Sequence, residues 1–129
     1  MSKSDKRKHK RYTCSIKTAF KYYTGNPENF DISTSTPEKG KGVIMDISCG
    51  GVLIASNSRV SAAMPIILSF KMNKENYNIQ GKIVRTGMLK NNPSEIAQKF
   101  KFFSSKGDFY IAVEFNEPIS DLKFQHFKK

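Results

Sequence analysis

Cysteine is scarce in this chain and long apolar stretches are missing, and both absences narrow the class of protein. Only two of the 129 residues are cysteine, Cys14 and Cys49. Because nothing else marks a disulfide framework, they predict reduced thiols in a cytoplasmic protein, and they lack the paired spacing of a zinc site. No apolar run is long enough to cross a bilayer, and none follows the charged N-terminus. We therefore expect neither a membrane span nor a standard secretion signal.

Acidic residues are also few. Eleven Asp and Glu residues stand against 22 Lys and Arg residues, which gives a formal net charge of +11 at pH 7. Much of the excess lies in residues 1–11, where Asp5 is the single acid, and such a block is normally solvated and mobile. The charge predicts a negatively charged ligand or partner, without choosing among phosphate, nucleic acid, membrane surface and acidic protein.

The groupings of residues that enzymes use are missing too. The sequence has no paired-carboxylate site, no cluster of metal ligands, no phosphate-cradling loop with a lysine and no nucleophile beside a histidine. His9 and His126 have no companion nucleophile or second acid. We predict that the chain is not an enzyme and holds no metal.

What the chain does have is a regular alternation of apolar and polar residues. A length of 129 residues with 38% hydrophobic residues suits one domain with one core. Gly81 suggests a bulge or bend within one of the alternating segments. The predicted strands, each with one buried face, are 12–22, 42–48, 52–55, 66–72, 77–84 and 109–115.

Polar segments separate these strands. Residues 24–41 have no sustained apolar period and are interpreted as a long, mobile connection. Residues 87–107 form another connection, in which a short helix starting at Pro93 would pack Phe100 and Phe103 onto the domain.

The elements together predict the fold class. Short strands alternating with turns favour an all-β fold, a small antiparallel six-stranded barrel with closed edges. Ser120 can cap a short C-terminal helix through Phe127. We therefore divide the chain into a flexible basic N-terminal arm, residues 1–11, and a barrel domain with its C-terminal helix, residues 12–129.

The turn between the second and third predicted strands gathers polar groups. Alternation places Asp46 and Ser48 together on one outward face. Gly50 and Gly51 suit a tight corner, and the missing Cβ of Gly51 allows a flat ligand or another backbone segment to approach. On the same alternation Ile44 points outward, and the inward residues are Val43, Met45 and Ile47.

Two motifs in a fixed order resemble the PilZ domain, a family of bacterial receptors for cyclic di-GMP. An Arg-x-x-x-Arg motif over residues 7–11 precedes the first strand, and Asp-x-Ser-x-x-Gly over residues 46–51 closes the second. The segments 81–85 and 111–115 are also similar to strands of this family. The resemblance implies a cytoplasmic second-messenger receptor that binds cyclic di-GMP.

The chemistry of the ligand suits the residues of both motifs. Arg7 and Arg11 can pair with guanine O6 and N7, stack on the purine or clamp a phosphate. Asp46 can accept the hydrogens on guanine N1 and N2, and Ser48 can accept or donate. The candidate ligand-binding residues are Lys6, Arg7, Arg11, Asp46, Ser48, Gly50, Gly51 and Arg85.

The resemblance also implies stoichiometry and partners. A basic residue before the first arginine, here Lys6, goes in this family with a stacked pair of nucleotides, which predicts two molecules per chain. Many members have proline where this chain has Lys10, so the arm is less preorganised. Ordering the arm over the ligand would signal to a downstream effector protein of motility, exopolysaccharide, pilus or virulence machinery.

Two alternatives remain open. The first is a PilZ-like adaptor that binds a protein but no nucleotide. The second is a small basic barrel that binds nucleic acid, against which stands the burial of most strand aromatics, since single-strand binders stack bases on exposed rings.

Overall fold

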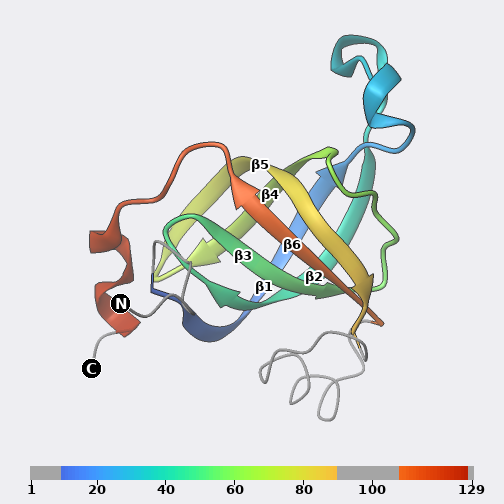
Figure 1. Cartoon of the computed structure of the whole chain (residues 1–129). Coiled ribbons are helices and arrows are strands. Elements are labelled where there is room, and N and C mark those ends of the chain that lie inside the picture. The colour runs from blue at the N-terminus through green and yellow to red at the C-terminus, as the bar shows by residue number, and fades with distance from the viewer. Residues whose placement is uncertain (1–9, 90–107, 128–129) are drawn as a thin grey trace, which may run out of the picture.

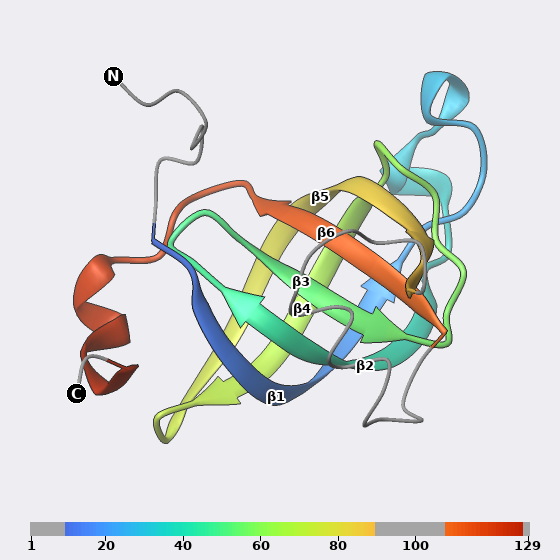
Figure 2. The same ribbon diagram turned by 60° about the horizontal axis from the view of Figure 1, so that its bottom comes forward.

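Six antiparallel strands close into a barrel in the computed structural model, which describes residues 10–89 and 108–127. The strands follow the order β1-β2-β3-β6-β5-β4 around the barrel, and β1 closes the circle by pairing with β4 (Figure 1 and Figure 2). The predicted fold class is confirmed. The strands are β1 (Tyr12–Tyr22), β2 (Glu38–Ile47), β3 (Gly51–Ser56), β4 (Pro65–Met72), β5 (Glu75–Met88) and β6 (Phe109–Phe115).

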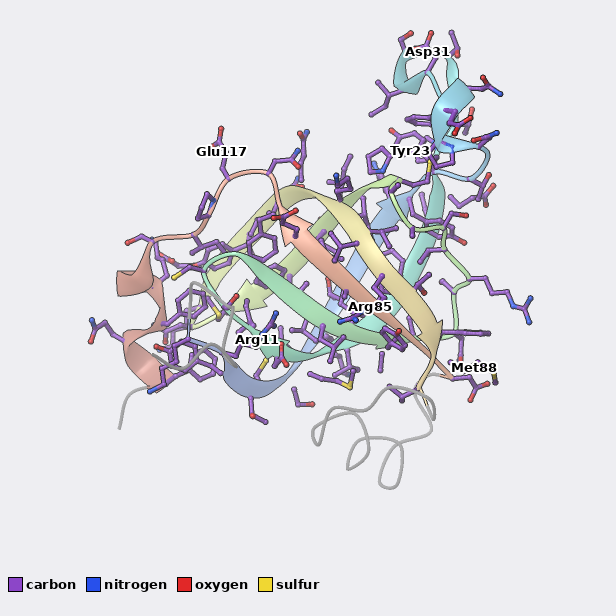
Figure 3. The ribbon with its side chains drawn as sticks, in the orientation of Figure 1. Arg11, Tyr23, Asp31, Arg85, Met88 and Glu117 are labelled. Atoms are coloured by element: carbon purple, nitrogen blue, oxygen red, sulfur yellow. The ribbon has the colours of Figure 1, made fainter. Side chains whose placement is uncertain are left out.

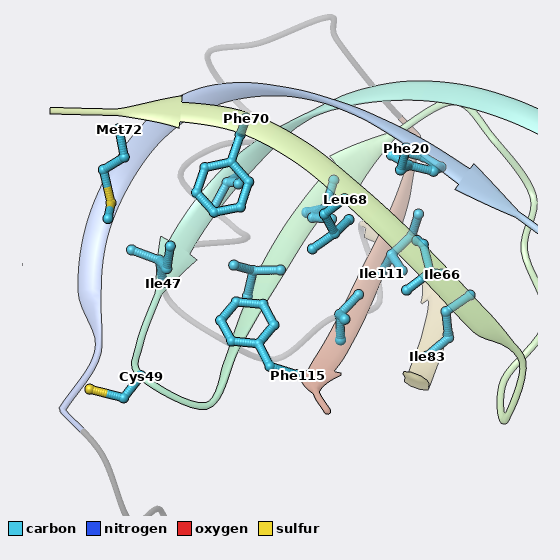
Figure 4. Packing of buried hydrophobic residues seen from close by; sticks show 14 of the residues in the cluster. Phe20, Ile47, Cys49, Ile66, Leu68, Phe70, Met72, Ile83, Ile111 and Phe115 are labelled. Atoms are coloured by element: carbon cyan, nitrogen blue, oxygen red, sulfur yellow. The ribbon is translucent and has the colours of Figure 1, made fainter. Parts of the chain in front are cut away.

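The barrel interior is filled by the residues that alternate inward along each strand. Ile66, Leu68, Phe70 and Met72 of β4 are all buried, as the alternation predicts. Figure 4 shows this row of side chains within the core, together with Ile111 of β6. Burial of this apolar surface is the main favourable term in folding, and the closed circle leaves no strand edge exposed.

The predicted faces of β2 are wrong for Val43, Ile44 and Met45, and Val43 lines the outer surface of the barrel. The pairing of β2 with β3 shifts between Ile44, opposite Ile54, and Asp46, opposite Leu53. Ile44 therefore points into the barrel core, and Met45 belongs to a second buried cluster with Leu53. One extra residue in a strand moves the side chains on either side of it out of strict alternation. The bulge still leaves Asp46 on the outer face, as predicted.

A second bulge lies in β5, three residues beyond the predicted site at Gly81. The pairing of β5 with β6 shifts between Ile83, opposite Val113, and Arg85, opposite Ala112. The extra residue is thus Val84, which is exposed. Gly81 has a different role: a Cβ there would lie 2.6 Å from the carbonyl oxygen of Glu114.

The connection between β1 and β2 is shorter than the predicted range 24–41. Strand β2 already begins at Glu38, and two 3-10 helices, η1 (Pro27–Asn29) and η2 (Ile32–Thr34), lie before it. Each helix begins after a side chain that accepts a hydrogen bond from the backbone N–H two residues further on. Figure 1 shows this connection projecting from one end of the barrel. The expected Phe100 and Phe103 helix lies outside the described residues.

The C-terminal helix packs against the other end of the barrel. It is a 3-10 helix, η4 (Asp121–Phe127), and lies near the start of β1 (Figure 1). Phe124 is fully buried, and its ring stacks on Tyr12 with centroids 5.4 Å apart. Phe127 stacks on the same ring at 5.1 Å. In the described part of the chain, no helix combines the length and the apolar character needed to cross a membrane.

Candidate functional site

Arg11 and Asp46 form a charged pair where the chain enters β1. The register of β1 and β2 places Thr13 opposite Asp46, so the residue just before β1 lies beside the end of β2. Arg11 Nη1 donates to Asp46 Oδ1 at 2.8 Å. The Asp46 side chain is 12% exposed and that of Arg11 34% exposed, so the pair lies at the rim of the barrel. A short, partly desolvated contact of this kind is a strong, directional one.

Ser48 shapes the turn that follows Asp46. Its N–H donates to the Gly51 carbonyl oxygen at 2.9 Å, and its Oγ accepts from the Gly50 N–H at 3.2 Å. The same hydroxyl lies 3.4 Å from the Gly51 carbonyl oxygen, to which it donates. Ser48 is buried, and its hydrogen bonds explain the Ser-x-x-Gly part of the motif.

Gly50 and Gly51 anchor the turn to β6. The Gly50 carbonyl oxygen accepts from the Phe115 N–H at 2.8 Å. Gly51 lies opposite Glu114, and a Cβ on Gly51 would overlap with the Val113 carbonyl oxygen. Of the two expected reasons for a missing Cβ at Gly51, close approach of another backbone segment is therefore present in the fold.

Arg85 shares the outer wall with Asp46 but lies three strands away. The registers run from Asp46 to Leu53, Ala112 and Arg85 across β2, β3, β6 and β5. With strands about 4.8 Å apart, the two backbones are roughly 14 Å apart along the wall. Arg85 is exposed (Figure 3). The fold thus brings Arg11 to Asp46 directly and leaves Arg85 within reach of a larger ligand only.

Two predicted residues cannot be placed. Lys6 and Arg7 lie outside the described residues, and Arg7 is the first arginine of the Arg-x-x-x-Arg motif. Sequence reasoning, in turn, missed Tyr12, which follows Arg11. Its hydroxyl is buried and has no hydrogen-bond partner among the residues that the structure describes, and Lys10 Nζ lies 5.5 Å from the centroid of its ring. The sequence feature that could have indicated Tyr12 is its position directly after the motif, at the first inward position of β1.

Cys14 lies near the charged pair and is predicted to be unreactive. Burial, and secondarily the negative charge of Asp46, raises the pKa of Cys14 to about 12 from 9.0. Its Sγ donates to the Ile44 carbonyl oxygen at 3.5 Å. Since the thiolate is the nucleophile, alkylation by iodoacetamide at pH 8 should be roughly a thousandfold slower than in the urea-unfolded chain. Peptide mass mapping separates Cys14 from Cys49, and similar rates in both states would contradict the raised pKa.

The fold and the site together define a small β-barrel domain with a charged pair at its rim, held by a tight polar turn. The model of the PilZ domain family matches residues 5–123, and the chain therefore belongs to that family. None of the curated proteins compared with the chain matches it significantly.

Two solved structures share this fold. The Bacillus subtilis inhibitor of motility, MotI/DgrA, is 13% identical with a TM-score of 0.57 over 96% of this chain and 49% of that one. The PilZ domain of Escherichia coli YcgR, solved with c-di-GMP, is 10% identical with a TM-score of 0.53 over 96% of this chain and 87% of that one. The chain thus spans about half the length of MotI. At such low identity the likeness concerns the fold alone.

Proposed function

We propose that this chain is a cytoplasmic bacterial receptor that binds cyclic di-GMP at the Arg11–Asp46 site and passes the signal to an effector protein. The observation that carries the proposal is the 2.8 Å pair itself, because it joins residues 35 positions apart from the two motifs of the family. Membership of the PilZ domain family supports it, as does the cyclic dinucleotide in the YcgR structure, which has the same fold.

The pair has the groups that a guanine needs. A guanidinium has five N–H donors in a planar fork, and the contact with Asp46 engages one of them. The fork can turn toward guanine O6 and N7 or toward a phosphate, as it does in guanine recognition elsewhere. Asp46 can accept the hydrogens on N1 and N2, which adenine does not present in the same arrangement. Asp46 therefore accounts for the preference for guanine over adenine, and Arg11 contributes a positive charge that attracts the phosphodiesters.

Arg7 and Lys6 complete the proposed site. Arg7 would take the second guanine or a phosphodiester, and Lys6 would favour a stacked pair of nucleotides, two per chain. Binding would bring Lys6 and Arg7 against the ligand at the rim, beside Arg11, and would change the surface that the effector meets. Arg85, three strands away, is the candidate for the far end of such a stacked pair.

Isothermal titration tests this function. Wild-type protein should bind cyclic di-GMP saturably, with a stoichiometry of two, and should give no heat with GTP, which has a guanine but not the cyclic arrangement of two. A stoichiometry of one would reject the stacked pair and leave the receptor function intact. No heat with cyclic di-GMP would reject the receptor function and favour an adaptor that binds protein without nucleotide.

A further inference from the structure

A basic groove lies on the outer surface of the barrel, apart from the Arg11–Asp46 site. It has a volume of about 1100 Å³ and lies over β1, β2, β4 and β5. None of the candidate ligand-binding residues that the structure describes lines it. The two sites therefore use different parts of the barrel wall.

Four lysines from two neighbouring strands line this groove. Lys17 and Lys21 lie on β1, Lys39 and Lys41 on β2, and all four are exposed. None of the described residues that line the groove is acidic. The groove therefore concentrates four of the positive charges that give the chain its net charge of +11.

The register makes this concentration costly to the fold. Lys21 lies directly opposite Lys39, and like charges opposite each other on an exposed face destabilise a strand pair. Elsewhere in the same barrel, Lys82 of β5 lies opposite Glu114 of β6, the favourable arrangement. A repulsive pair with no acid beside it in the groove lining indicates a surface kept for an anionic partner.

Other polar residues of the lining, which also includes the apolar Ala19, Val43 and Ile67, indicate which kind of anion binds. Asn57, Asn78, Gln80 and Ser69 add amide and hydroxyl groups that can bond a peptide backbone. The aromatic ring among the described lining residues, Phe20, is 3% exposed and cannot stack a base. A flat bilayer would meet the rim of a groove and leave its floor empty. Carboxylates on a polypeptide match the lysines, the amides and the concave shape together.

We propose that this groove binds an acidic, Asp- and Glu-rich segment of the effector protein, in an extended conformation. The distance from Lys17 to Lys21 along β1 is about 13 Å at 3.3 Å per residue, which corresponds to roughly four residues of an extended peptide. That the partner is an effector protein rests on the proposed function. The existence of the groove and its positive charge are independent of that function. Nucleotide sensing at one wall and partner binding at another would then occur on a single domain.

Fluorescence anisotropy with a labelled octaglutamate peptide tests the groove. The variant Lys21→Glu/Lys39→Glu should bind the peptide at least tenfold more weakly than wild type. The matched control, Lys71→Glu/Lys74→Glu, makes the same change in net charge at exposed lysines outside the groove lining and should lose less than threefold. Equal losses in the two variants would show that net charge alone attracts the peptide and would overturn the proposal.

Titrations with nucleic acid, lipid vesicles and cyclic di-GMP distinguish the other possible ligands of the groove and test whether the groove and the Arg11–Asp46 site are independent. An eight-nucleotide thymidine oligomer or phosphatidylglycerol vesicles that bind more tightly than the peptide, and lose binding in the groove variant, would overturn the peptide assignment. The groove variant should bind cyclic di-GMP as wild type does, since Arg11 and Asp46 are unchanged. If wild type binds the peptide in the groove but not cyclic di-GMP, the receptor function fails while the groove proposal stands.

Discussion

Arg11→Ala is expected to weaken the binding of cyclic di-GMP about a hundredfold or more. The substitution removes the guanidinium fork that lies 2.8 Å from Asp46, and each charge-assisted hydrogen bond is worth about 1.5 to 3 kcal/mol. Arg11→Lys should recover little of the loss, because lysine keeps the charge but has no planar fork. Isothermal titration measures both, after circular dichroism has shown that the variants are folded.

Arg59→Ala is the matched control for this prediction. Arg59 lies over the ring of Phe109, 5.3 Å from its centroid, and is not among the candidate site residues. The control removes the same charge and should bind cyclic di-GMP within twofold of wild type. If Arg11→Ala keeps its affinity for cyclic di-GMP, or if Arg59→Ala loses as much affinity, the Arg11–Asp46 pair is not the binding site.

Gly51→Ala is expected to destabilise the fold by about 3 kcal/mol, seen as a fall in Tm of roughly 10 °C. The new Cβ would overlap with the Val113 carbonyl oxygen, and backbone in the middle of a paired strand has little room to move. Thermal denaturation followed by circular dichroism measures the effect. The physical reason is steric, so the loss should be the same with and without ligand.

Gly87→Ala distinguishes this steric effect from a general cost of replacing glycine. A Cβ at Gly87 would lie 3.0 Å from the edge of the Tyr110 ring, which can shift as a backbone carbonyl cannot. We expect a cost below about 1 kcal/mol there. If Gly51→Ala melts like wild type but loses cyclic di-GMP binding, Gly51 acts through the ligand and the close approach to β6 does not explain it.

Alternation along single strands predicted most of this fold. The inward row of β4 and the bounds of β6, Phe109–Phe115, follow from local periodicity, because each side chain's face depends only on its parity within a straight strand. The same reasoning failed from Val43 to Met45, because a bulge at Met45 adds one residue to the strand. A bulge depends on the spacing of the partner strand, which the sequence of β2 alone does not contain.

The candidate site divides in the same way. Motif spacing pointed to Arg11 and Asp46 as partners, and the fold brings them to 2.8 Å. The motif did not reveal that the Ser48 hydroxyl is engaged in its own turn, or that Gly51 accommodates the backbone of a strand more than sixty residues later. Those roles depend on which strand lies next to β3, and that is a property of the closed barrel.

The amino-acid sequence by itself determined that the chain is a basic, strand-rich domain whose two motifs name the family, because charge, periodicity and motif spacing are local properties. The tertiary structure decided which charges meet. Strand order brings Arg11 to an acid at one wall, and strand register sets Lys21 against Lys39 at another. Residues far apart in sequence share a surface only after the sheet closes, so a site and a groove made from several strands depend on that closure.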